Sequence, residues 1–136
     1  MKLLVCGPVA HGNIQKIREL QNFLKKEGFN VIDQFREEEM DYSSIRDFRD
    51  KKRLAERIVE NDLKFIEECD VIVAICDKPS FGTAIEIYYA KKLGKKVIVL
   101  NEEAQPSPWP IAFAEQVVRS KEELIKILLK ALMNPS

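Results

Sequence analysis

Side chains that commonly bind transition metals are scarce in this sequence of 136 residues, which has one histidine and three cysteines. Cys6, Cys69 and Cys76 lack the spacing of a metal site, and an odd number of cysteines does not suggest a disulfide framework. Two of them fall in or beside short apolar runs, where a free cysteine behaves as a small hydrophobic residue. We therefore expect three core thiols in a reducing compartment and no metal centre.

An excess of charge of either sign is also missing. Lysine and arginine total 22, as do aspartate and glutamate, so the net charge is zero. Proteins that bind nucleic acid polymers neutralise many phosphates and usually carry a basic surface. The composition therefore argues against a nucleic acid partner and favours a small ligand or another protein.

Long apolar runs are absent as well. None of the runs reaches the length of a membrane span, and Met1 and Lys2 lead directly into a strand-like segment with no signal-peptide pattern. We therefore expect a cytoplasmic protein with no membrane partner. The length fits one domain over residues 1–136, with a core that needs no metal or disulfide.

The most informative stretch of the chain runs from residue 69 to residue 101. Its apolar runs Val71 to Cys76 and Val97 to Leu100 are rich in β-branched residues, which suits strands buried on both faces. Thr83 to Leu93 has an apolar face and good helix formers, and Gly94 follows as a C-terminal stop. A strand, a helix and a strand in this order predict a βαβ unit with parallel strands and a right-handed crossover.

Strands and helices alternate along the rest of the chain. Further strands are predicted at Leu3 to Cys6, Phe29 to Ile32 and Gln116 to Val118, and further helices between Asn13 and Gly28, from Lys51 to Glu68 and from Lys121 to Met133. The pattern predicts a three-layer α/β sandwich around a five-stranded parallel sheet, flavodoxin-like or Rossmann-like, in the order 2-1-3-4-5. Residues 33–50 have no clean period, and we expect a mobile segment or a lid there.

Asp62 is unusual because it interrupts the apolar stripe that contains Ile58 and Ile66. A buried carboxylate loses several kcal/mol of hydration unless it is paired or reaches a wet cleft. A cleft explains its position most simply. A partly exposed aspartate paired with a nearby lysine or arginine is the structural alternative.

Glu86 is the second unusual carboxylate. With Thr83 it matches a capping box, so its role could be purely structural. Yet the same position lies in the first turn of a helix that points at the carboxyl edge of the sheet, where ligands of α/β proteins bind. Two carboxylates in one crevice are typical of enzymes that cleave glycosidic bonds.

Two loops at the same edge of the sheet offer substrate-binding groups. Ser80 and Gly82 precede a helix, where a hydroxyl and free N–H groups suit an anionic oxygen such as phosphate. The loop after the first strand adds further candidates, namely Gly7, Pro8, His11 and Gly12. Neither loop has the spacing of a Walker or dinucleotide-binding motif, so an ordinary βα turn is the alternative for both.

Four motifs occur together in this half of the chain: N-D-L at Asn61 to Leu63, D-V-I-V-A at Asp70 to Ala74, P-S-x-G-T-A-x-E-I-x-Y-A at Pro79 to Ala90, and G-K-K at Gly94 to Lys96. In this combination the chain resembles the nucleoside 2-deoxyribosyltransferase superfamily. The resemblance implies that Glu86 attacks the anomeric carbon and forms a covalent glycosyl-enzyme. It also implies that Asp62 positions the sugar and moves a proton to the base.

Ser80 is similar to the serine that helps to hold the 5'-phosphate in 2'-deoxynucleoside 5'-phosphate N-hydrolases, whereas the transferases carry an aspartate there. The resemblance therefore implies an N-glycosidase that cleaves (deoxy)nucleoside 5'-monophosphates without a cofactor. It also implies a homodimer in which a neighbour's loop, here residues 107–111, closes the pocket. The sequence departs from the family pattern at Leu4, where a tyrosine is usual, and at Ala10, where the hydrolases have an arginine.

Two alternative functions remain open at this point. The first is a deoxyribosyltransferase, which passes the sugar between two bases. The second is a non-catalytic nucleotide-binding module, which the departures at Leu4 and Ala10 favour.

Overall fold

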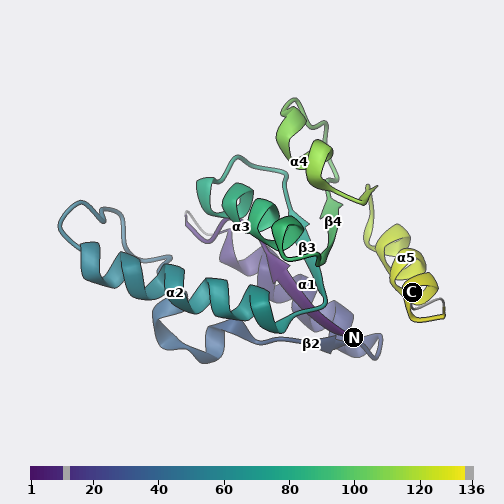
Figure 1. The fold of residues 1–136 in the computed structure, drawn as a ribbon, viewed down its shortest axis with the longest axis horizontal. Helices are drawn as coiled ribbons and strands as arrows, with labels where there is room; N and C mark the ends of the chain where they lie inside the picture. Colours follow the sequence, from purple (N-terminus) through teal and green to yellow (C-terminus); the bar gives the residue numbers. More distant parts are fainter. Residues whose placement is uncertain (11–12, 134–136) are drawn as a thin grey trace.

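The structure is a computed structural model, and it describes residues 1–10 and 13–133. A sheet of five strands lies at its centre, in the order β2-β1-β3-β4-β5 (Figure 1). The strands are β1 (Lys2–Cys6), β2 (Asn30–Val31), β3 (Val71–Ile75), β4 (Lys96–Leu100) and β5 (Gln116–Val118). Every pair of neighbouring strands is parallel. The predicted parallel sheet and its strand order are therefore confirmed.

Helices cover both faces of the sheet, which confirms the three-layer sandwich. They are α1 (Ile14–Lys26), α2 (Lys52–Glu68), α3 (Phe81–Lys92), α4 (Pro108–Phe113) and α5 (Lys121–Met133). Alternate side chains of a strand point to opposite faces. In β1, Leu4 and Cys6 pack with α2 and α3, whereas Leu3 and Val5 pack with α1 and α5. In Figure 1, α2 and α3 lie in front of the sheet and α1 lies behind it.

Two helices differ from the sequence prediction. α3 begins at Phe81 rather than Thr83, because the Ser80 hydroxyl accepts a hydrogen bond from the backbone N–H of Thr83 at 3.2 Å and caps the helix. α4 begins within the proline-rich stretch from Glu102 to Pro110, whose composition predicts a connection and no helix. Pro108 occupies its first turn, where the fixed φ and missing N–H of proline are compatible with a helix.

Residues 33–50 pack against the rest of the protein more closely than is expected of a mobile segment or a lid. They contain two short 3-10 helices, η1 (Gln34–Arg36) and η2 (Glu38–Met40), and η2 packs against α2. The buried Gln34 amide donates a hydrogen bond to the carbonyl of Val5 at 2.6 Å and accepts one from Gln21 at 2.7 Å. These bonds fasten the segment to both β1 and α1.

The three cysteines are free and buried, as predicted. Within the described parts of the chain, no helix has the length and apolar character that a bilayer crossing requires.

Candidate active site

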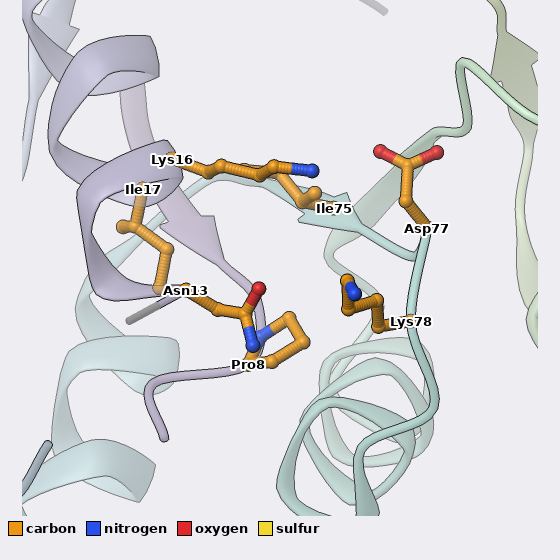
Figure 2. Close-up of a pocket in the computed structure, with 7 residues that line it drawn as sticks. All are labelled: Pro8, Asn13, Lys16, Ile17, Ile75, Asp77 and Lys78. Atoms are coloured by element: carbon orange, nitrogen blue, oxygen red, sulfur yellow. The ribbon is translucent and has the colours of Figure 1, made fainter. Parts of the chain in front are cut away.

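The loops after β1 and β3 leave neighbouring strands toward opposite faces of the sheet, since β1 leads to α1 and β3 leads to α3. Ligands of open α/β proteins bind in the crevice that such a divergence creates. A small pocket lies at this point, lined by Pro8, Asn13, Lys16, Ile17, Ile75, Asp77 and Lys78. Figure 2 shows Lys16 and Lys78 extending into the space between the two loops. The crevice is therefore bordered by two ammonium groups and by the carboxylate of Asp77.

Asp62 of α2 and Glu86 of α3 meet on the α2/α3 face of the sheet. α2 and α3 are packed side by side, and both carboxyl groups are half-buried. Asp62 lies one turn from the buried Ile58 and one turn from the buried Ile66, so the apolar stripe carries it inward. The two carboxyls share a hydrogen bond. Among the described residues, neither of them forms an ion pair with lysine or arginine.

The electrostatics of this pair favour one shared proton. Burial raises the pKa of Glu86 well above its usual range, and the charge of Asp62 and the hydrogen bond to it raise the pKa further. Burial also raises the pKa of Asp62, while the hydrogen bond from Glu86 partly offsets that effect. One of the two groups is therefore protonated and donates in this hydrogen bond, and the other is ionised and accepts. Two close carboxyls of this kind titrate as a unit and retain one proton when the first charge has formed.

Glu86 does not occupy the position that a capping box requires. Because α3 begins at Phe81, Glu86 lies in its second turn rather than its first. Ser80 is the capping residue, and its oxygen accepts hydrogen bonds from the N–H of Thr83 and, at 3.1 Å, from the Thr83 hydroxyl. The Glu86 side chain is thus free of the helix terminus and turns toward α2.

The other predicted binding residues fall into separate groups. Pro8 lines the crevice. Gly7 is buried, and a Cβ there would lie 3.2 Å from the Cβ of Ile75, so tight packing between β1 and β3 already explains this glycine. Gly82 has open space around it in the first turn of α3. His11 and Gly12 lie outside the described residues.

Cys6 also contacts the carboxyl pair, which the sequence did not indicate. Burial raises the pKa of Cys6 well above its usual range, and the charges of Glu86 and Asp62 raise it further. The alternation of β1 could have suggested this contact, because Cys6 shares the face of Leu4 and stands at the carboxyl end of the strand.

A polar network fixes the loops beside the crevice. The Asp77 carboxylate accepts hydrogen bonds from the backbone N–H groups of Glu102 at 2.9 Å and Glu103 at 3.2 Å. The Gln105 amide donates to the carbonyl of Cys76 at 2.7 Å and to the buried Asn101 at 2.6 Å. The connection after β4 is thereby held against the loop that leads into α3.

No group of three or more histidine, cysteine, aspartate or glutamate side chains is arranged to hold a metal ion within residues 1–10 and 13–133.

Comparison with known proteins gives a consistent result. A family model described as nucleoside 2-deoxyribosyltransferase matches residues 4–128. A 2-deoxyribosyltransferase from the psychrotolerant bacterium Bacillus psychrosaccharolyticus has a similar structure, with a TM-score of 0.72 and 17% identity over 91% of this chain and 90% of that protein. A search of curated proteins found no match.

Two further solved structures share the fold. The CMP N-glycosidase BcmB of Clostridium botulinum has a TM-score of 0.59 and 20% identity over 94% of this chain and 98% of its own. A conserved protein from Enterococcus faecalis V583 has a TM-score of 0.65 and 18% identity over 93% of this chain and 95% of its own.

Proposed function

Since the chain belongs to the nucleoside 2-deoxyribosyltransferase family of enzymes, we propose that it is an N-glycosidase for (deoxy)nucleoside 5'-monophosphates. The family acts on the bond between base and sugar. Glu86 is the proposed nucleophile and Asp62 the proposed proton donor. The observation that carries the proposal is the hydrogen-bonded carboxyl pair between α2 and α3.

The reaction requires an ionised carboxylate as the nucleophile and a protonated carboxyl as the proton donor. A carboxyl pair with a single shared proton supplies both. The ionised Glu86 attacks C1', the bond from C1' to the base nitrogen breaks, and Asp62 transfers its proton to the departing base. Water then attacks C1' of the glycosyl ester and gives a proton to Asp62, which releases Glu86 as a carboxylate. The shared hydrogen bond is a direct route by which the proton reaches Asp62 and leaves Glu86 ionised.

Ser80 supports the choice of a 5'-monophosphate as the substrate. Its oxygen accepts two hydrogen bonds from Thr83, and within the described residues its own proton has no acceptor. The exposed N–H groups in the first turn of α3 favour an anion, and Lys16 and Lys78 add positive charge at the adjoining crevice.

Replacing Ser80 by alanine should raise KM for a nucleoside monophosphate about 10-fold, because one hydrogen bond to a charged phosphate is lost. KM for the nucleoside without phosphate should not change. Ser120→Ala is the matched control, since the Ser120 hydroxyl caps α5 in the same way by accepting a hydrogen bond from Glu123 at 3.1 Å. An equal change for both substrates would contradict a phosphate role.

One incubation tests the proposed reaction against its closest alternative. The enzyme is given a nucleoside monophosphate, and then the same nucleotide with an excess of a second free base. A hydrolase yields sugar phosphate and free base in both cases, whereas a transferase yields a new nucleotide in the second. The transferase remains the alternative because the family description names that activity. If no base is released from any nucleotide or nucleoside, both the hydrolase and the transferase are refuted.

We also propose a homodimer that forms through α3 and α4. Several large apolar side chains are exposed here: Phe81 at 95%, Trp109 at 67%, Ile85 at 61%, Tyr88 at 48% and Ile111 at 41%. Ile85, Tyr88 and Trp109 also line an apolar groove between the two helices. Contiguous exposed apolar surface of this kind is typical of an interface.

Replacing Ile85 by aspartate should convert this dimer into a monomer, because a charge would be buried in the interface. Light scattering coupled to gel filtration measures the change in mass. Leu129→Asp is the matched control, since Leu129 is 48% exposed on α5 and should leave the dimer intact. A wild-type protein that is monomeric at 100 μM would contradict the proposed assembly.

A further inference from the structure

The Asp77 carboxylate borders the crevice between β1 and β3, yet it does not pair with the lysines there. Among the described residues, Asp77, Lys16 and Lys78 form no ion pair. One Asp77 oxygen instead accepts hydrogen bonds from the backbone N–H groups of Glu102 at 2.9 Å and Glu103 at 3.2 Å. Figure 2 shows the Asp77 and Lys78 side chains diverging from one loop. Both ammonium groups are therefore left available to an anion.

Gln105 fastens the connection after β4 to the loop that contains Asp77. Its amide nitrogen donates hydrogen bonds to the backbone carbonyl of Cys76 at 2.7 Å and to the side-chain oxygen of Asn101 at 2.6 Å. Its oxygen accepts a hydrogen bond from the backbone N–H of Ser107 at 3.0 Å. Both N–H donors and the oxygen of this side chain are therefore used. One side chain joins the residue before Asp77 to both ends of the connection.

Asn101 ties the same network to the sheet. It is 4% exposed, and its backbone N–H donates a hydrogen bond to the carbonyl of Val118 in β5 at 2.9 Å. Its side-chain nitrogen donates to the carbonyl of Glu103 and, at 3.5 Å, to the Asp77 carboxylate. A buried polar network with all its members bonded is rigid. The hydrogen bonds therefore run without a break from β5, through Asn101 and Gln105, to the loop after β3.

From this network we infer that Gln105 is a positioning residue that keeps the Asp77 carboxylate away from the lysines of the crevice. The inference rests on the proposed function for the identity of the anion, the phosphate of the substrate. Without Gln105 the connection is no longer held to the end of β3, and Asp77 loses the N–H donors that orient it. Lys16 and Lys78 then become its partners. An ion pair with either lysine competes with the phosphate for positive charge.

Gln105→Met tests the inference, because methionine has a similar length and removes all three hydrogen bonds. Gln105 is half-buried in a connection, so the variant should fold. We expect KM for a nucleoside monophosphate to rise about 10-fold, with little change in kcat or in KM for the nucleoside. Gln21→Met is the matched control, since Gln21 is a buried amide on α1 that donates to Gln34 at 2.7 Å. It should lower Tm without changing KM for either substrate.

A double variant separates the charge of Asp77 from a general loosening of the loop. Asparagine has nearly the shape of aspartate but no charge with which to pair a lysine. Adding Asp77→Asn to Gln105→Met should therefore restore most of the lost affinity. Gln105→Met should cost about 10-fold when Asp77 is present and less than about 2-fold when it is introduced together with Asp77→Asn. An equal cost in both cases would overturn the inference, because the charge of Asp77 would then play no part.

Binding of inorganic phosphate to the free proteins separates this inference from the proposed function. Titrations at low ionic strength, followed by NMR, give the dissociation constants. Weaker binding in Gln105→Met that Asp77→Asn reverses supports the inference even if no nucleotide is cleaved, in which case only the proposed function fails. Unchanged binding in Gln105→Met, or a wild-type protein that binds no phosphate, overturns the inference even if the wild-type protein is an active N-glycosidase.

Discussion

Replacing Glu86 by glutamine should abolish base release, with kcat lower by about 10⁴-fold or more. Glutamine has nearly the shape of glutamate but cannot attack C1' or form the glycosyl ester. Because glutamine keeps the size and shape of the side chain, the dissociation constant of the nucleotide should change only a few-fold. Chromatography of the released base measures the rate, and calorimetry measures binding. Alanine at this position should give the same loss of activity.

The same Glu86→Gln substitution should raise the melting temperature at pH 8. The pKa of Glu86 is raised in the folded protein relative to the unfolded chain. This carboxyl therefore destabilises the fold increasingly as the pH rises above the usual carboxyl range of about 4, and not below it. The gain should be a few degrees at pH 8, since about 1 kcal/mol corresponds to roughly 3–5 °C in a protein of this size. It should vanish near pH 4.

The matched control for both effects is Glu60→Gln, on the exposed side of α2. It should leave the rate and the melting temperature unchanged. A Glu86→Gln protein that releases base at the wild-type rate would refute the proposal that Glu86 is the nucleophile. One that melts lower than wild type at pH 8 would show that the Glu86 carboxylate stabilises the fold instead.

Replacing Asp62 by asparagine should lower kcat by about 10² to 10³-fold, because the departing base loses its proton donor. The acidic limb of the pH–rate profile should also move to lower pH. Asp62 raises the pKa of Glu86 both by its charge and by accepting a hydrogen bond, so its removal lowers that pKa. Initial rates measured from pH 4 to pH 9 report both effects.

A second substrate separates proton donation from a general loss of structure in Asp62→Asn. A nucleotide with an N7-methylated purine already carries a positive charge on its base, so it leaves without a proton from the enzyme. The asparagine variant should cleave this nucleotide at a rate much closer to that of the wild type. An equal loss for both substrates would contradict the role of Asp62 as proton donor.

The sheet could be predicted from the sequence because its strands are short, continuous apolar runs separated by helical patterns. β3 and β4 are buried over nearly their whole length, and such runs have few alternatives in a parallel sheet. β2 is shorter than predicted, since only Asn30 and Val31 pair with β1. The buried Phe29 and Ile32 beside it contribute side chains to the core, and the Ile32 N–H still donates a hydrogen bond to the carbonyl of Leu3 at 2.8 Å.

The sequence predicted part of the carboxyl pair's arrangement. An acidic residue on an apolar stripe predicted that Asp62 lies against something other than bulk solvent, and the helix after β3 predicted the position of Glu86. The position of Cys6 beside the pair was harder to predict, because Cys6 has the pattern of an ordinary core residue and only the alternation of β1 indicates its face. The order of residues 33–50 could not be predicted, because it depends on tertiary hydrogen bonds such as that between Gln34 and Val5.

Three short helical segments, η1, η2 and α4, were not predicted, and the reasons are physical. The 3-10 turns of residues 33–50 are too short to show a period, and their order comes from contacts with α1 and α2. α4 has six residues, and its prolines mask the helical pattern. The start of α3 was misplaced because Ser80 and Thr83 both have the chemistry of a capping residue.

A crystal structure of the Glu86→Gln variant with a nucleoside 5'-monophosphate tests the paired-carboxyl account most directly. We predict that the bound sugar separates the two hydrogen-bonded side chains, so that C1' lies between positions 62 and 86 with their carboxyl and amide groups about 5 to 5.5 Å apart, as in retaining glycosidases, and that the phosphate lies at Ser80. A nucleotide whose sugar lies away from α2 and α3, or an Asp62 side chain turned to bulk solvent beside a bound nucleotide, would contradict it.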